Sequence, residues 1–97
     1  MARKIHHDQA GRRFWAETAD GSEAHLAYEQ PDDETLDLVS TFVPKEARGE
    51  GLASDIVQYA FDHARHHDLQ VVATCPYVQD WLEKHPDYQA VAVRPRR

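Results

Sequence analysis

The chain has 97 residues, with 17 acidic and 11 basic side chains and a formal net charge of −6. This length suits one domain, residues 1–97, built around a single core. This negative net charge argues against binding to nucleic acid or to an anionic membrane. It is explained either by solubility or by attraction of a cationic acceptor such as an amine. The one cysteine excludes an internal disulfide and suits a reducing compartment. Because no segment resembles a signal peptide or a membrane span, we expect a cytoplasmic protein.

The first half of the chain predicts antiparallel strands, because apolar and polar residues alternate there. The expected strands are residues 5–7, 13–18, 22–29 and 35–43. Asp20-Gly21 predicts a two-residue hairpin loop, with the glycine supplying a positive φ. The polar stretch from Gln30 to Glu34 predicts a loop.

The second half predicts two helices that alternate with short strands. From about Gly51 to His67 the apolar residues recur with a helical period. The expected buried face contains Leu52, Ile56, Tyr59, Ala60 and His63. Residues 69–74 read as a strand, Pro76 suits the first turn of a second helix that ends near Lys84, and residues 89–93 read as a last strand. This order predicts an α+β fold: a mixed, mostly antiparallel sheet of about six strands with two helices.

The segment from Thr41 to Ser54 predicts an anion-binding turn. A strand ends at Val43-Pro44, a charged turn with two glycines follows, and a helix begins. Backbone N–H groups at a helix N-terminus attract phosphate oxygens. Gly49 and Gly51 allow a ligand to approach the backbone closely, and Arg48 supplies a permanent cation.

Val43-Pro44 followed by Arg48-Gly49-x-Gly51-Leu52-Ala53 resembles the acetyl-CoA diphosphate loop of the GNAT superfamily of N-acetyltransferases. The resemblance continues through residues 71–78 and 81–88, and in the first half it covers the strand pattern only. It implies a minimal GNAT-like fold that uses acetyl-CoA as cosubstrate. The diphosphate would lie on Arg48, Gly49, Glu50, Gly51, Leu52 and Ala53. The acetyl and pantetheine arm would lie on Thr41, Phe42 and Val43, where this strand is expected to diverge from the one ending near Thr74.

Glu46 departs from the family pattern, which has Arg or Gln at this position. A carboxylate beside a diphosphate is unfavourable, so we expect Glu46 to point away and to pair with Arg48 or a lysine.

Cys75, the candidate catalytic residue, stands one residue before Pro76 and is a plausible helix N-cap. A helix N-terminus favours the thiolate, which would suit an acetyl acceptor or a group touching the thioester. A small buried apolar side chain is the alternative. Trp81 stands where many GNAT enzymes have a tyrosine that protonates the departing thiolate, which an indole cannot do. Tyr77, Tyr88 and Cys75 are substitutes by proximity in sequence.

The seven histidines of the chain do not predict a metal site. His63, His66 and His67 lie at helical spacing near a helix C-terminus, where cations are favourable without a metal. His6, His7 and His25 are expected on strands, as solvated residues or general bases.

The leading hypothesis is transfer of an acetyl group from acetyl-CoA to an unknown amine, with a protein or peptide amine suited to an open acceptor side. One alternative is a CoA-binding module without turnover, and another is an interaction protein whose glycine loop is only structural. We expect a monomer or a weak homodimer.

Overall fold

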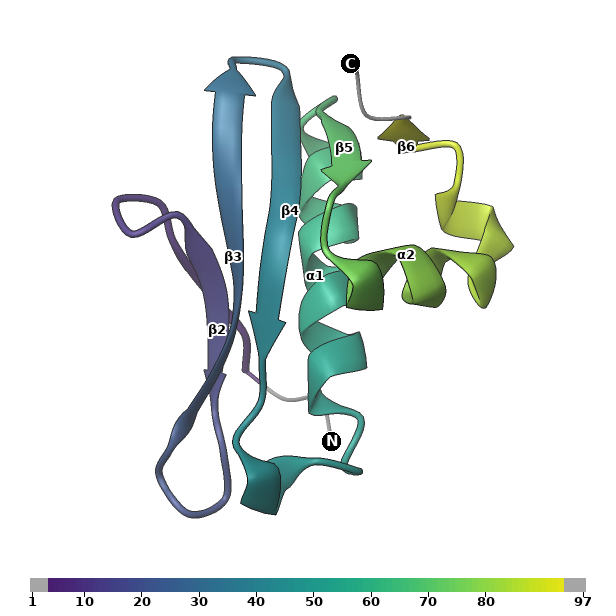
Figure 1. Ribbon diagram of the computed structural model, residues 1–97. Helices are drawn as coiled ribbons and strands as arrows, with labels where there is room; N and C mark the ends of the chain where they lie inside the picture. The colour runs from purple at the N-terminus through teal and green to yellow at the C-terminus, as the bar shows by residue number, and fades with distance from the viewer. Residues whose placement is uncertain (1–3, 94–97) are drawn as a thin grey trace.

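Six strands form one mixed sheet in a computed structural model of the chain, which describes residues 4–93 (Figure 1). The strands are β1 (His6–Asp8), β2 (Arg13–Glu17), β3 (Glu23–Asp32), β4 (Thr35–Phe42), β5 (Gln70–Ala73) and β6 (Ala92–Val93). The helices are α1 (Leu52–His66) and α2 (Pro76–Glu83), with short 3₁₀ turns η1 (Lys45–Ala47) and η2 (Pro86–Tyr88). Strands β1 to β4 pair antiparallel in chain order, while β5 is parallel to β4 and β6 is parallel to β5. The predicted α+β fold with a mostly antiparallel mixed sheet and two helices is confirmed.

Both helices cover the same face of the sheet. Helix α1 connects the parallel strands β4 and β5, and α2 connects the parallel strands β5 and β6. Because both connections move in the same direction along the sheet and such connections are right-handed, the two helices lie on the same side. The helices pack together through Phe61 and Trp81, whose stacked rings have centroids 5.3 Å apart. Side chains of β2, β3 and β4 alternate between buried and partly exposed positions. Among residues 4–93, no helix lies over the second face of the sheet, which we name the open face.

The first hairpin differs from the prediction in the length of its loop. Thr18 N donates to Ser22 O at 2.8 Å, so the loop has three residues, Ala19 to Gly21, and not two. Gly21 has the expected positive φ of 87°. Three-residue and two-residue hairpin loops both need a residue with positive φ. Asp20-Gly21 is therefore compatible with either loop length.

The second hairpin replaces the polar loop that was predicted from Gln30 to Glu34. Strand β3 continues to Asp32, and the turn is closed where Asp32 Oδ1 accepts from Glu34 N at 2.8 Å. Pro31 is tolerated because the register shifts between Glu29 and Asp32, where the regular ladder is interrupted.

The buried face of α1 was predicted incompletely. Leu52, Ile56 and Ala60 are buried as expected, but Tyr59 is 40% exposed and Phe61 is fully buried. The reason is tertiary: α2 covers the side of α1 that carries Phe61, which gives the helix a second buried flank. Neither helix in the described part of the chain is long and apolar enough to cross a membrane.

Candidate functional site

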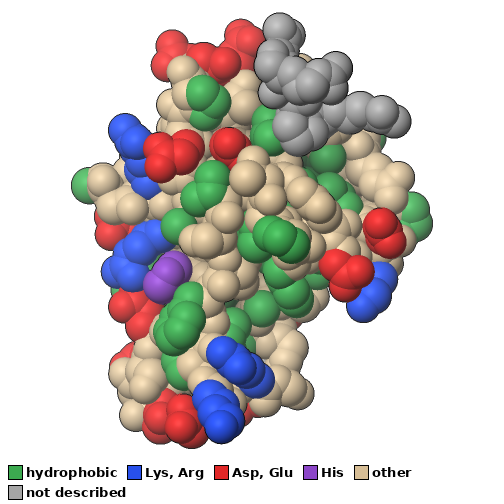
Figure 2. All heavy atoms as spheres, in the orientation of Figure 1, with side chains coloured by type: hydrophobic (Ala, Val, Ile, Leu, Met, Phe, Trp, Pro, Cys, Tyr) green, Lys and Arg blue, Asp and Glu red, His purple; other side chains and the backbone are tan. Residues whose placement is uncertain are grey.

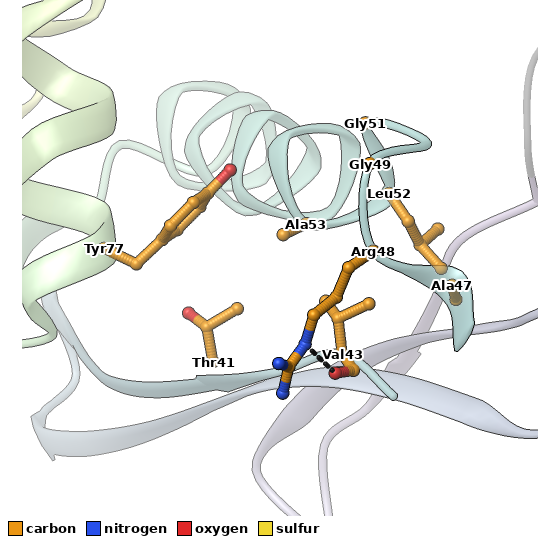
Figure 3. A pocket seen from close by; sticks show the side chains of 9 residues that line it. All are labelled: Thr41, Val43, Ala47, Arg48, Gly49, Gly51, Leu52, Ala53 and Tyr77. Atoms are coloured by element: carbon orange, nitrogen blue, oxygen red, sulfur yellow. Dashed lines mark hydrogen bonds between the residues drawn. The ribbon is translucent and has the colours of Figure 1, made fainter. Parts of the chain in front are cut away.

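A cavity of about 470 Å³ lies where the end of β4, the N-terminus of α1 and the first turn of α2 meet (Figure 3). Its lining residues are Thr41, Val43, Ala47, Arg48, Gly49, Gly51, Leu52, Ala53 and Tyr77. Seven of the nine residues that the sequence predicts for acetyl-CoA binding therefore lie around one cavity. Phe42 and Glu50 lie outside this lining, and Ala47 and Tyr77 join it.

The loop before α1 presents backbone donors to the cavity. Gly49 and Gly51 have φ values of 90° and 77°, and a Cβ at either position would meet nothing within 4 Å. Gly51 is the N-cap of α1 and no side chain caps the helix. The first hydrogen bond within the helix runs from Asp55 N to Gly51 O at 3.0 Å, so the N–H groups of residues 52–54 have no helical acceptor. These donors and the dipole of the 15-residue helix suit an anion with several oxygens.

Arg48 crosses the cavity mouth and contacts the end of the strand. Its Nε donates to the Val43 carbonyl oxygen at 3.1 Å (Figure 3), which uses one of the five guanidinium N–H donors. The side chain is exposed. Glu46 takes no part in the ion pairs that the structure shows among residues 4–93, so its predicted pairing with Arg48 or a lysine is not found.

The predicted divergence of β4 from β5 is confirmed. Their pairing ends at Leu38 and Ala73, and the Leu38 carbonyl then accepts from both Thr74 N, at 3.1 Å, and Cys75 N, at 2.8 Å. Strand β4 continues to Phe42 with β3 on its other edge only. The last residues of β4 therefore present one edge of backbone groups that a ligand with amide groups can pair with.

Cys75 is the N-cap of α2, as predicted, but its side chain lies outside the cavity lining. It is buried, with only 4% of its surface exposed, and its Sγ lies 3.4 Å from Thr41 Oγ1. Thr41 itself lines the cavity. The thiol therefore lies behind Thr41, a position that suits packing better than direct attack on a ligand.

Tyr77 was predicted only as a possible proton donor close to Trp81 in sequence, and the structure places it in the cavity wall. It projects from α2 into the cavity opposite Arg48, with Thr41 on the strand between them (Figure 3). Burial is the main cause that raises the pKa of the Tyr77 hydroxyl, so the group keeps its proton at neutral pH. Its position one residue after Pro76, in the first turn of a helix that begins beside the divergent strand, was the available signal.

Trp81, at the family's tyrosine position, and Tyr88, another proposed substitute for that tyrosine, are both buried away from the cavity lining. Trp81 is 3% exposed, and its Nε1 donates to Ser54 Oγ at 2.8 Å, which ties α2 to the first turn of α1. Tyr88 is also buried, and its hydroxyl donates to Asp62 Oδ1 at 2.8 Å. Trp81 packs α2 against α1, and Tyr88 packs η2 against both helices.

Four of the seven histidines, His7, His63, His66 and His67, gather at the opposite end of α1. A second cavity of about 370 Å³ is lined there by Tyr59, Asp62, His63, His66 and His67. The His63 ring lies 4.6 Å from that of His7 and 4.4 Å from that of His67. Burial, followed by the neighbouring His7, His67 and His66, lowers the pKa of His63 to about 4. Within residues 4–93, no three histidine, cysteine or carboxylate side chains are placed to hold a metal ion.

Comparison with known proteins points to one family. Residues 13–91 match the family described as GCN5-related N-acetyl-transferase. The chain is 32% identical over 84 residues to Protein NATD1 of Xenopus tropicalis, covering 86% of this chain and 77% of that protein. It is 33% identical over 88 residues to Protein NATD1 of Danio rerio, covering 89% and 79% respectively. The NMR structure of a GCN5-like protein from Staphylococcus aureus superposes with a TM-score of 0.74 at 23% identity, over 100% of this chain and 95% of that one, and this shows the shared fold.

Proposed function

This chain belongs to the family of GCN5-related N-acetyl-transferases, and from that premise we propose that it binds acetyl-CoA in the cavity at the N-terminus of α1 and transfers the acetyl group to an amine. The observation that carries the proposal is the joint placement of the glycine loop, the free helix N-terminus and the divergent edge of β4 around one cavity.

Each part of the cavity suits one part of this ligand. Backbone N–H groups from Gly49 to Ser54 and the Arg48 guanidinium would hold the diphosphate. The free edge of β4 from Val39 to Phe42 would pair with the amide groups of the pantetheine arm. Acetyl-CoA supplies an activated acetyl group as a thioester. A backbone N–H of β4 that faces the acetyl carbonyl would stabilise negative charge developing on its oxygen.

Tyr77 is the group we assign to proton donation towards the departing sulfur. It stands in the cavity wall and its raised pKa keeps the hydroxyl protonated. General acid catalysis of this kind typically contributes about 10²- to 10⁴-fold in rate. Cys75 is then a packing residue behind Thr41, and acetyl transfer to the amine is direct.

A second candidate function is acetyl-CoA binding without turnover. Arg48 and Tyr77 are the titratable members of the cavity lining, so no lining residue in the described part of the chain is a carboxylate or histidine that would accept the proton of the attacking amine. This observation favours a binding module. Turnover would require that the amine binds in its neutral form or that water accepts the proton that the amine loses.

Thermal unfolding with added CoA and acetyl-CoA tests binding. A ligand at 100 times its Kd should stabilise the folded protein by about 2.7 kcal/mol. The absence of any shift in melting temperature with either ligand would remove both candidate functions.

Release of free thiol from acetyl-CoA with a panel of amines then separates enzyme from binding module. The decisive variant is Tyr77→Phe, which we expect to bind CoA as the natural chain does while losing turnover. Equal turnover in the two proteins would exclude Tyr77 as the acid, and no thiol release with any amine would favour the module.

A further inference from the structure

An aromatic row crosses the open face of the sheet. His6 pairs with Trp15, Trp15 with His25, and His25 with Phe42, so these four residues stand directly opposite one another on β1 to β4. The rings of His6 and Trp15 stack with centroids 4.2 Å apart, and those of His25 and Phe42 are 5.6 Å apart. Phe42 is 48% exposed, the highest value among the large apolar side chains of residues 4–93. With strands about 4.8 Å apart, the row is about 14 Å long, the length of about four extended residues.

Carboxylates stand on both sides of the aromatic row. By strand alternation the open face also carries Asp8, Glu17, Glu23, Glu29 and Asp37. Glu17 pairs directly with Glu23 on one side of the row, and Glu29 pairs directly with Asp37 on the other. Like charges placed directly opposite on neighbouring strands destabilise a sheet.

Two arginines offset part of this charge. Arg13 forms ion pairs with Asp8, at 3.4 Å, and with Glu23, and its guanidinium lies 5.6 Å from the Trp15 ring centroid. Arg12 pairs with Glu29 at 2.9 Å, although both side chains are more than half exposed. Five carboxylates against two arginines leave the face acidic. In the orientation of Figure 1, several hydrophobic side chains lie in the middle of the surface, with acidic and basic side chains towards its edges (Figure 2).

The aromatic row ends beside the proposed acetyl-CoA cavity. Phe42 follows Thr41, which lines the cavity, and both belong to the part of β4 that has left β5. A chain lying along the row therefore runs across the four strands on the open face and reaches the free edge of β4, next to the residue that lines the cavity from the helix side. A flat face of this length suits an extended polypeptide better than a small molecule, which needs a concave site.

We propose that the open face binds an extended basic segment of another protein, with its cationic side chains beside the acidic pairs and an acceptor lysine at the Phe42 end. The lysine's role as acceptor rests on the proposed acetyl transfer, while binding of the segment does not. Cations gain from both the carboxylates and the exposed ring of Phe42. A second copy of this chain is disfavoured as the occupant, because it would bring a net charge of −6 to an acidic face.

The test uses a labelled ten-residue peptide with four lysines among glycines and serines, and a matched peptide with glutamates in place of the lysines. Binding to the full chain is measured by fluorescence anisotropy at 20 and 200 mM salt, with and without CoA. We expect binding of the basic peptide only, and weaker binding at the higher salt. The double variant Glu17→Lys with Glu29→Lys should weaken it at least tenfold.

The matched control is Glu83→Lys with Asp87→Lys, which changes the net charge equally on exposed residues of α2 and η2. We expect this control to bind the basic peptide within about twofold of the natural chain. Equal weakening in both double variants, or no binding at all, would overturn the proposal. Sedimentation that shows a dimer, lost on Glu17→Lys with Glu29→Lys, would assign the face to a second copy instead. If the basic peptide binds but CoA causes no thermal shift, the peptide-binding surface is supported and the proposed acetyl transfer is excluded.

Discussion

The two ends of helix α1 both border a cavity, and they differ in what they offer a ligand. The N-terminal cavity, about 470 Å³, is lined by glycines, apolar side chains, Thr41, Arg48 and Tyr77. The C-terminal cavity, about 370 Å³, is lined by imidazoles with Tyr59 and Asp62. At the first end the backbone donors have no helical acceptors, whereas at the second the polar side chains contact one another.

This difference shows that volume alone does not identify a binding site. An anion at the N-terminus gains unsatisfied donors, a helix dipole and a cation. A ligand at the C-terminal end must displace contacts among side chains that already stack and hydrogen-bond. The histidine end should therefore govern how stability depends on pH, and the glycine end should govern ligand affinity.

The largest expected effect comes from the residue that ties α2 to the N-terminal end. Trp81→Ala removes the stacking on Phe61 and the hydrogen bond to Ser54, and should lower the free energy of unfolding by about 3–5 kcal/mol. Urea denaturation measures this loss. Trp81→Phe, which keeps a ring and loses the hydrogen bond, should cost much less. A loss below about 1 kcal/mol in Trp81→Ala would mean that the helices do not depend on this contact.

Arg48→Ala should weaken CoA binding while leaving the fold intact. Arg48 is exposed, and a charge-assisted contact to phosphate is typically worth about 1.5–3 kcal/mol, or about 10- to 150-fold in Kd. Titration calorimetry with CoA measures the change. Arg65→Ala, which removes a cation near the other end of the helix, is the matched control and should leave the Kd unchanged. The same Kd in Arg48→Ala and the natural chain would contradict the assigned cavity.

Acid should destabilise the histidine end. The pKa of His63 is lowered to about 4 in the folded protein from 6.5 in the unfolded chain. Between these values the unfolded chain holds a proton that the folded protein lacks, so the free energy of unfolding falls as the pH is lowered. The loss should be about 1–2 kcal/mol, because partial exposure screens the effect.

Urea denaturation at pH 7.5 and 4.5 measures this dependence. His63→Gln should flatten it, whereas Arg48→Ala, at the other end of the helix, should keep the slope of the natural chain. An unchanged slope in His63→Gln would show that the acid sensitivity arises elsewhere.

Cys75→Ser should have the smallest effect. The hydroxyl retains a partner in Thr41 Oγ1 and serine is a favoured N-cap, so stability should change by less than about 1 kcal/mol. Turnover should survive, and mass spectrometry after incubation with acetyl-CoA should find no acetyl group on Cys75. An acetylated Cys75 that passes its acetyl group to an amine would contradict direct transfer.

The sequence by itself determined the order of the elements and the position of the glycine loop. Strand alternation, the helical period after Gly51 and the proline at the start of α2 depend on residues close together in the chain. The residues around Arg48 were identified for the same reason, because a strand, a turn and a helix N-terminus follow one another directly. Cys75 was placed at the N-cap from its neighbour Pro76 alone.

Only the tertiary structure decided which side chains meet. Tyr77 enters the cavity and Cys75 lies behind Thr41 because β4 diverges from β5 at Leu38, a contact between distant segments. Phe61 is buried because α2 packs against α1. The aromatic row forms because three successive strand pairings align His6, Trp15, His25 and Phe42. The turns and the hydrophobic pattern fix the register of each neighbouring pair of strands, but the packing of helices and the meeting of distant strands depend on burial summed over the whole core.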